Sequence, residues 1–132
     1  MPHLAHITLI GRDYDEALAF YIGKLGFTLV EDTAIPQQRK RWVTIAPPGA
    51  PAHAATLLLA RAAAPEQAAA IGKQGAGRVL LFLATQDFAR DYAAYKKAGV
   101  NFVREPATHD YGTVTVFEDL YGNRWDLVQF AQ

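Results

Sequence analysis

One segment of this chain occurs twice, and that repetition constrains the fold more than any single motif. The stretch RDYDEALAFYIGKLGF in the first half is echoed by TQDFARDYAAYKKAGV in the second. Matching residues recur 74 positions apart, with the terminal glycine recurring after 73: Asp13 and Asp87, Tyr14 and Phe88, Leu18 and Tyr92, Tyr21 and Tyr95, Gly26 and Gly99. Chance similarity rarely keeps a capping Asp, an apolar stripe and a closing glycine in one order, so we expect a duplicated module.

Length and charge narrow the class of protein. The 132 residues suit one ordinary domain that buries about two-thirds of its unfolded surface. Lys plus Arg and Asp plus Glu each total 13, so no net field steers the chain toward nucleic acid or an anionic membrane. The chain has no Cys, which excludes disulfides and thiolate chemistry.

The sequence also lacks targeting features. Its first residues, MPHLAHITLIG, are not those of a secretory signal, and no apolar run approaches the roughly 20 residues of a membrane helix. We therefore expect a cytoplasmic protein that binds neither nucleic acid nor membranes.

The first module reads in the order β-α-β-β-β. Residues 3–10 form a buried strand, and Asp13 caps a helix whose apolar stripe runs to Leu25 and ends at Gly26. Three further strands are predicted over residues 27–30, 41–46 and 54–60, with a polar loop over 36–40.

The second module repeats this order after an Ala-rich and Gly-rich connection. The strand VLLFLAT precedes a helix capped by Asp87 and closed by Gly99, and residues 100–104 form the next strand. GTVTVFED and RWDLVQF complete the module, with a hairpin turn at Gly122 and Asn123. We expect one domain over residues 1–132, made of module 1 (1–61), a linker (62–77) and module 2 (78–132).

Two such modules, with HITLIGRDYDEALAFYIGKLGF at the front and YGTVTVFEDLYGNRWDLVQF at the back, resemble the vicinal oxygen chelate superfamily, which includes glyoxalase I, extradiol dioxygenases and bleomycin-binding resistance proteins. The resemblance implies an α+β fold: two tandem βαβββ modules whose curved half-barrel sheets surround a cleft, the glyoxalase/bleomycin-resistance fold. It also implies a homodimer, and it leaves the activity open because members include lyases, transferases, dioxygenases and pure binders.

The resemblance places candidate metal ligands at four positions. His6 matches the first-strand histidine, and Asp126 stands where the family usually has Glu. The other two positions hold Leu80, which has no electron pair to donate, and Thr56, a poor ligand. A catalytic divalent ion needs about three protein ligands, so we expect no tightly bound metal or other cofactor. A metal held weakly by His6 and Asp126, or completed by a partner subunit, is the alternative.

The same strands supply candidates for lining a ligand cleft. Residues two apart on a strand share a face, which groups Asp126 with Val128 and Phe130, and assigns Trp125 to the core. The predicted cleft is an apolar wall with a few polar points, which suits a small organic molecule. Its candidate residues are His6, Thr8, Trp42, Thr56, Leu80, Tyr111, Phe117, Val128 and Phe130.

Other polar residues are weaker candidates. The basic run Arg39, Lys40 and Arg41 could attract a substrate carboxylate or phosphate, but a solvated loop explains it better, so the run is a secondary site candidate. Glu118 and Asp119 precede the YGN turn, where short acidic side chains commonly cap backbone amides. His6 itself could serve only as a hydrogen-bonded residue lining the cleft.

Three functions follow from these residues. The first is a protein that binds a small organic molecule in the cleft without transforming it, and with no complete metal site. The second is a divalent-metal-dependent lyase or isomerase of the glyoxalase I type, or a relative of the dioxygenases, that uses His6 and Asp126. The third is a noncatalytic dimeric interaction domain with a vestigial cleft.

Overall fold

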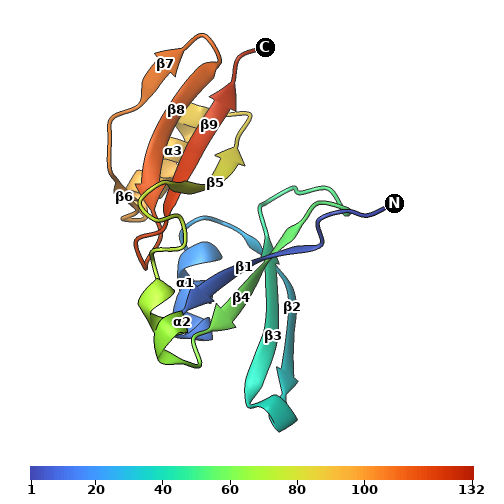
Figure 1. Cartoon of the computed structure of the whole chain (residues 1–132). Helices are drawn as coiled ribbons and strands as arrows, with labels where there is room; N and C mark the ends of the chain where they lie inside the picture. The colour runs from blue at the N-terminus through green and yellow to red at the C-terminus, as the bar shows by residue number, and fades with distance from the viewer. The chain divides into compact units, whose positions relative to one another are not determined.

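A computed structural model describes all 132 residues and divides the chain into two compact units, Met1–Ile71 and Gly72–Gln132. Each unit has a mixed β-sheet of its own (Figure 1). One predicted module lies in each unit, and the predicted linker is divided between them. The two sheets with few helices confirm the α+β class and agree with tandem modules.

Unit 1 is built on a four-stranded sheet in the order β1-β4-β3-β2. Its elements are β1 (His6–Gly11), α1 (Tyr14–Tyr21), β2 (Thr28–Ile35), β3 (Lys40–Ala46), β4 (Thr56–Arg61) and α2 (Pro65–Ala70). β1 and β4 run parallel, whereas β4, β3 and β2 are joined antiparallel. The last strand of the predicted module therefore pairs with the first.

The core of unit 1 forms where α1 packs on one face of this sheet. Asp13 starts the helix, since its side chain accepts a hydrogen bond from the Glu16 amide. The buried residues of this layer are Leu9, Tyr14, Ala17, Phe20, Tyr21, Val43, Ile45, Leu57 and Leu59. The alternate strand residues, including His6 and Thr8, face the other way and are free to form a site.

Unit 2 repeats the topology with the strand order β5-β9-β8-β6. Its elements are β5 (Val79–Ala84), α3 (Phe88–Lys97), β6 (Asn101–Phe102), β7 (Ala107–His109), β8 (Gly112–Glu118) and β9 (Arg124–Phe130). Again the first and last strands, β5 and β9, are parallel, and β9 and β8 are antiparallel. Figure 1 shows α3 behind the strands of this sheet.

An aromatic cluster forms the core of unit 2. Phe117 is fully buried and stacks on Trp125 with ring centroids 5.9 Å apart. Tyr95 of α3 meets the same Phe117 ring edge-on at 5.8 Å, and Phe102 lies 6.0 Å away. Aromatic pairs at these spacings contribute about 0.5–1.5 kcal/mol beyond their buried area.

The structure differs from the sequence reading at three places. The α1 helix ends at Tyr21 and continues as turns to Leu25, and β2 extends through Ile35. Residues 107–109 form a short strand, β7, where no strand was predicted. β2 lies at the sheet edge and its side chains are mostly exposed, so it lacks the apolar alternation by which strands are recognised.

The helices of the chain are short. None is both long enough and apolar enough to cross a bilayer.

Candidate functional site

The exposed face of the unit 1 sheet carries a histidine held by its neighbour. His6 pairs in register with Thr56, and its Nδ1 lies 2.7 Å from the Thr56 hydroxyl oxygen. Both residues occupy the face opposite α1, because the alternate residues Leu9, Leu57 and Leu59 are buried against the helix. The hydrogen bond fixes the orientation of the imidazole on a rigid strand.

Trp42 adds an aromatic wall to this position. Its ring meets His6 edge-on, with centroids 5.3 Å apart and an interplanar angle of 82°. Thr8 lies on the same face and pairs with Leu58 of β4. The structure thus places His6, Thr8, Trp42 and Thr56, four residues that the sequence indicated, on one face of the sheet. They form an indole wall with three polar side chains beside it.

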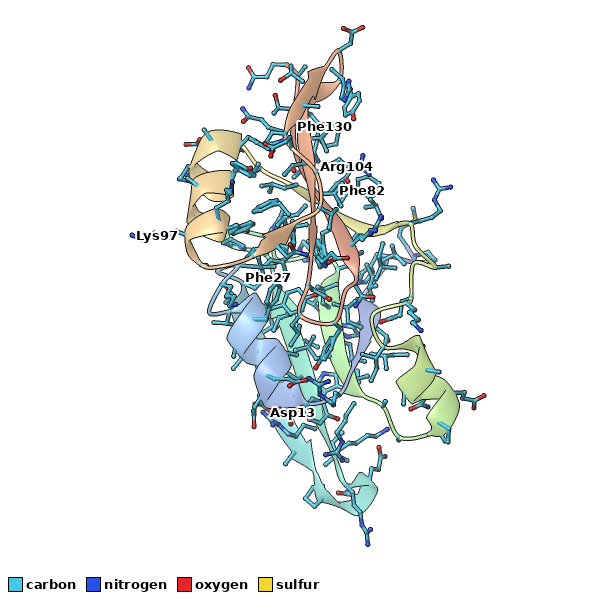
Figure 2. The ribbon with its side chains drawn as sticks, turned by 90° about the vertical axis from the view of Figure 1, so that its left-hand side faces the viewer. Asp13, Phe27, Phe82, Lys97, Arg104 and Phe130 are labelled. Carbon is cyan, nitrogen blue, oxygen red and sulfur yellow. The ribbon has the colours of Figure 1, made fainter.

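The corresponding face of the unit 2 sheet is more apolar. Asp126 sits between Phe82 of β5 and Val116 of β8 in the strand register. Phe82 is 66% exposed and Phe130 is 57% exposed. Val128, which lies between Asp126 and Phe130 on the same face of β9, is buried. Figure 2 shows the labelled Phe82 and Phe130 on the side of the strands away from α3, whose end is marked by Lys97.

The carboxyl group of Asp126 is sensitive to this apolar setting. Burial raises the pKa of Asp126, because the charged form loses solvation, and the positive charge of Arg104 partly offsets that increase. Arg124, two residues before Asp126 in β9, lies 3.9 Å from Glu118 instead. The neighbouring Asp119 does cap the turn, since its carboxylate accepts hydrogen bonds from the Tyr121 and Asn123 amides.

The remaining predicted cleft residues are placed differently from one another. Phe117 does not line an exposed face, because it has the parity of Trp125 and is buried beneath α3. Tyr111 is 53% exposed and stacks on His109 at 5.3 Å. Leu80 is half-buried at the start of β5, next to a register irregularity.

Two residues of the unit 2 face were not anticipated. Phe82 belongs to the run VLLFLA, in which every residue is apolar, so periodicity could not separate an exposed face from a buried one. Arg104 follows β6 in sequence, far from Asp126, and only the paired strands bring its charge near. The alternation of β9, where Asp126 and Phe130 share a parity, was the one available signal.

The possible metal ligands do not belong to one unit. His6 belongs to unit 1 and Asp126 to unit 2, and neither unit gathers three or more His, Asp or Glu side chains in an arrangement that could hold a metal ion. Within unit 1 the partner of His6 is the neutral hydroxyl of Thr56.

Comparison with known proteins agrees with this architecture. The family model of the Glyoxalase/Bleomycin resistance protein/Dioxygenase superfamily matches residues 3–127. A protein of Shewanella frigidimarina (strain NCIMB 400) is 56% identical over 126 residues, which cover 96% of this chain and 92% of the relative.

Two solved structures are similar over nearly the whole chain. The structure of UcmS2 has a TM-score of 0.82 and 31% identity, covering 97% of this chain and 98% of UcmS2. The structure of TnmS3, an antibiotic binding protein from Streptomyces sp. CB03234, has a TM-score of 0.76 and 25% identity, covering 99% of this chain and 98% of TnmS3. With its repeated sheet topology and a family match over most of its length, this chain belongs to the Glyoxalase/Bleomycin resistance protein/Dioxygenase superfamily.

Proposed function

We propose that this chain binds a small, partly hydrophobic organic molecule on the exposed faces of its sheets and releases it unchanged. The observation that carries the proposal is the group formed by His6, Trp42 and Thr56, in which an oriented imidazole stands against an indole on a rigid sheet. Sites for small organic ligands typically combine apolar and aromatic walls with a few placed polar groups. The similarity to TnmS3, an antibiotic binding protein, supports the same assignment.

The chemistry of the side chains favours binding over metal-dependent turnover. At the family's ligand positions, Thr56 offers a neutral hydroxyl that is already hydrogen-bonded to His6, and Leu80 offers no donor. His6 and Asp126 alone fall short of the roughly three protein ligands that a catalytic divalent ion needs. The residues therefore do not fit a catalytic metal site.

The binding proposal can be tested with a neutral aromatic probe. N-phenyl-1-naphthylamine fluoresces when it enters an apolar site, and we expect saturable binding to the purified protein. His6→Ala should weaken that binding about fivefold, which corresponds to the loss of about 1 kcal/mol of aromatic and polar contact. His53→Ala is the matched control, because His53 is an exposed turn residue.

The enzymatic alternative makes the opposite prediction. If the protein is a lyase of the glyoxalase I type, it should contain stoichiometric Zn, Fe, Ni or Mn after purification without added metal. It should also convert the adduct of methylglyoxal and glutathione, and His6→Ala should abolish that turnover. Finding both would contradict the binding proposal.

We further propose that the protein acts in the cytoplasm, as its sequence predicts, and that it forms a homodimer, as the family resemblance implies. The exposed Phe82 and Phe130 support an association surface on unit 2. Sedimentation velocity on the purified chain should give the mass of two copies, and a single copy at all concentrations would reject this part of the proposal.

A further inference from the structure

A cavity lies in unit 1, where β3 begins and β4 ends. Its volume is about 350 Å³, within the size range of small-molecule sites. Its apolar lining includes Ile35, Leu58 and Ala60, and Trp42 forms part of its wall. The polar side chains around it are largely basic: Arg39, Lys40, Arg41 and Arg61.

The backbone directs these basic residues to one place. Arg39 has a left-handed conformation (φ 54°) at the end of the short turn Pro36–Gln38. Its carbonyl accepts a hydrogen bond of 3.0 Å from the Arg61 guanidinium. The same guanidinium lies over the Tyr14 ring, 5.7 Å from its centroid. Both of these partners of Arg61 are neutral, so neither compensates its positive charge.

The charges in this cavity do not balance. Arg41 is neutralised by Asp32 at 2.7 Å and by Asp15 at 3.0 Å. No acidic side chain forms an ion pair with Arg39, Lys40 or Arg61. Three cations therefore surround an apolar floor in a chain whose overall net charge is zero.

We propose that this cavity binds a small organic anion. The carboxylate or phosphate ester group of the ligand faces Arg39, Lys40 and Arg61, and the compact apolar body of the ligand lies against Ile35, Leu58 and Ala60. Guanidinium and ammonium groups form charge-assisted hydrogen bonds to both kinds of anion, and the fork of Arg61 suits two oxygens at once. This site is additional to the one proposed around His6 and Thr56, with which it shares only Trp42.

The test is calorimetric titration of the full chain with three naphthalene derivatives of one shape: naphthalene-2-carboxylate, 2-naphthyl phosphate and the neutral naphthalene-2-carboxamide. We expect one or both anions to bind, with an affinity that falls as salt is added, and the amide to bind at least about tenfold more weakly. Which anion binds more tightly identifies the natural head group. An amide that binds the His6→Ala chain as tightly as the anions do would overturn the proposal, because that variant weakens the neutral site and leaves the basic residues intact.

Matched variants locate the binding. Lys40→Gln removes an exposed charge with no partner and should weaken anion binding about tenfold, and Arg61→Gln should do at least as much. Lys97→Gln makes the same charge change on α3 in unit 2 and should bind like the unchanged chain. If Lys40→Gln and Lys97→Gln bind the anions equally well, the site is not here. His6→Ala leaves these residues intact, so a failure of the neutral-probe proposal would not alter the anion titration.

Discussion

Tyr14 contacts two of the basic residues, Arg41 and Arg61, that lie around the cavity of unit 1. Its ring is buried and contacts two guanidinium groups, with Arg41 5.1 Å and Arg61 5.7 Å from the centroid. The backbone amide of Arg41 donates a hydrogen bond of 3.3 Å to the Tyr14 hydroxyl. One aromatic side chain thus joins the start of α1 to β3 and β4, and it orients the charges beside it.

The ion pair of Asp32 with Arg41 should give a measurable, pH-dependent stability. A hydrogen bond from Arg41 is the main reason that the pKa of Asp32 lies below its ordinary value of 3.8. The pair therefore stabilises the fold above that ordinary value, and the contribution is lost as the pH falls through the lowered pKa. We expect Asp32→Asn to cost up to about 1 kcal/mol at neutral pH and nothing in strong acid.

Urea unfolding at both pH values measures this difference. Asp110→Asn, which alters an exposed acid, should change stability equally little at each pH. A cost of Asp32→Asn that persists in strong acid would show that the ion pair is not its cause.

Tyr95 should ionise late. Burial raises the pKa of its hydroxyl from 10.0 to about 12, with a smaller contribution from the charge of Asp91. Because the raised pKa belongs to the folded state, the contribution of Tyr95 to stability is complete below pH 10.0 and is lost as the pH rises through about 12. Absorbance titration of tyrosinate should reveal this late group in the unchanged chain and not in Tyr95→Phe.

At the scale of elements, the two halves begin their main helices in the same way. Asp13 accepts a hydrogen bond from the Glu16 amide, and Asp87 accepts one from the Arg90 amide at 3.1 Å. In both cases a side-chain oxygen satisfies an amide that has no partner within the helix. The repeated Asp of the sequence therefore has the same role in both halves, which is to cap the start of the main helix.

Removing a cap tests this equivalence. We expect Asp87→Ala to lower the free energy of unfolding by about 1 kcal/mol. Asp87→Ser should retain most of that stability, because its hydroxyl can accept the same hydrogen bond. Urea midpoints for the two variants measure the difference, and equal losses would argue that the carboxylate acts by some means other than capping.

Gly72 and Gly77, near the start of unit 2, share a positive φ, but only Gly72 also lies close to another segment of the backbone. Both have positive φ, +76° and +87°, which strains any other residue. A Cβ on Gly72 would also lie 1.9 Å from the Tyr121 carbonyl oxygen, whereas a Cβ on Gly77 would meet nothing within 4 Å. Thermal unfolding should show a markedly larger loss for Gly72→Ala than for Gly77→Ala. Similar losses would mean that the Tyr121 segment shifts readily.

At the scale of the whole molecule, each unit presents one packed and one exposed sheet face. In unit 2 the packed face holds Phe117 and the exposed face holds Phe82. Because the strand register places them on opposite sides of one sheet, the same residue type serves packing in one place and remains available for contact in the other.

Alanine substitutions should separate these two roles. Phe117→Ala should cost about 3–5 kcal/mol of stability, as is usual for a buried phenylalanine. At protein concentrations low enough for the chain to be a single copy, Phe82→Ala should change stability by no more than about 0.5 kcal/mol. Chemical denaturation compares them directly. A large loss in Phe82→Ala would show that its ring is covered in solution.

The sequence predicted features that depend on neighbouring residues better than those that depend on pairing across strands. The repeat, the Asp13 and Asp87 caps and the buried Trp125 are confirmed, because capping and strand parity are local. Phe82 was missed because every residue of its strand is apolar, so the sequence does not show which residues face the core. The His6 and Thr56 pair was placed by resemblance, since nothing local indicates that residues 50 positions apart hydrogen-bond.

The position of the last strand in each unit has a consequence for synthesis. β9 lies between β5 and β8, so β5 has no strand to pair with until residues 124–130 have left the ribosome. Unit 1 has the same arrangement, with β4 between β1 and β3, yet its final strand has been synthesised when less than half of the chain has been made. We therefore expect unit 1 to be able to complete its sheet during translation, and a chain interrupted before residue 124 to leave the apolar segment VLLFLA exposed to proteases and chaperones.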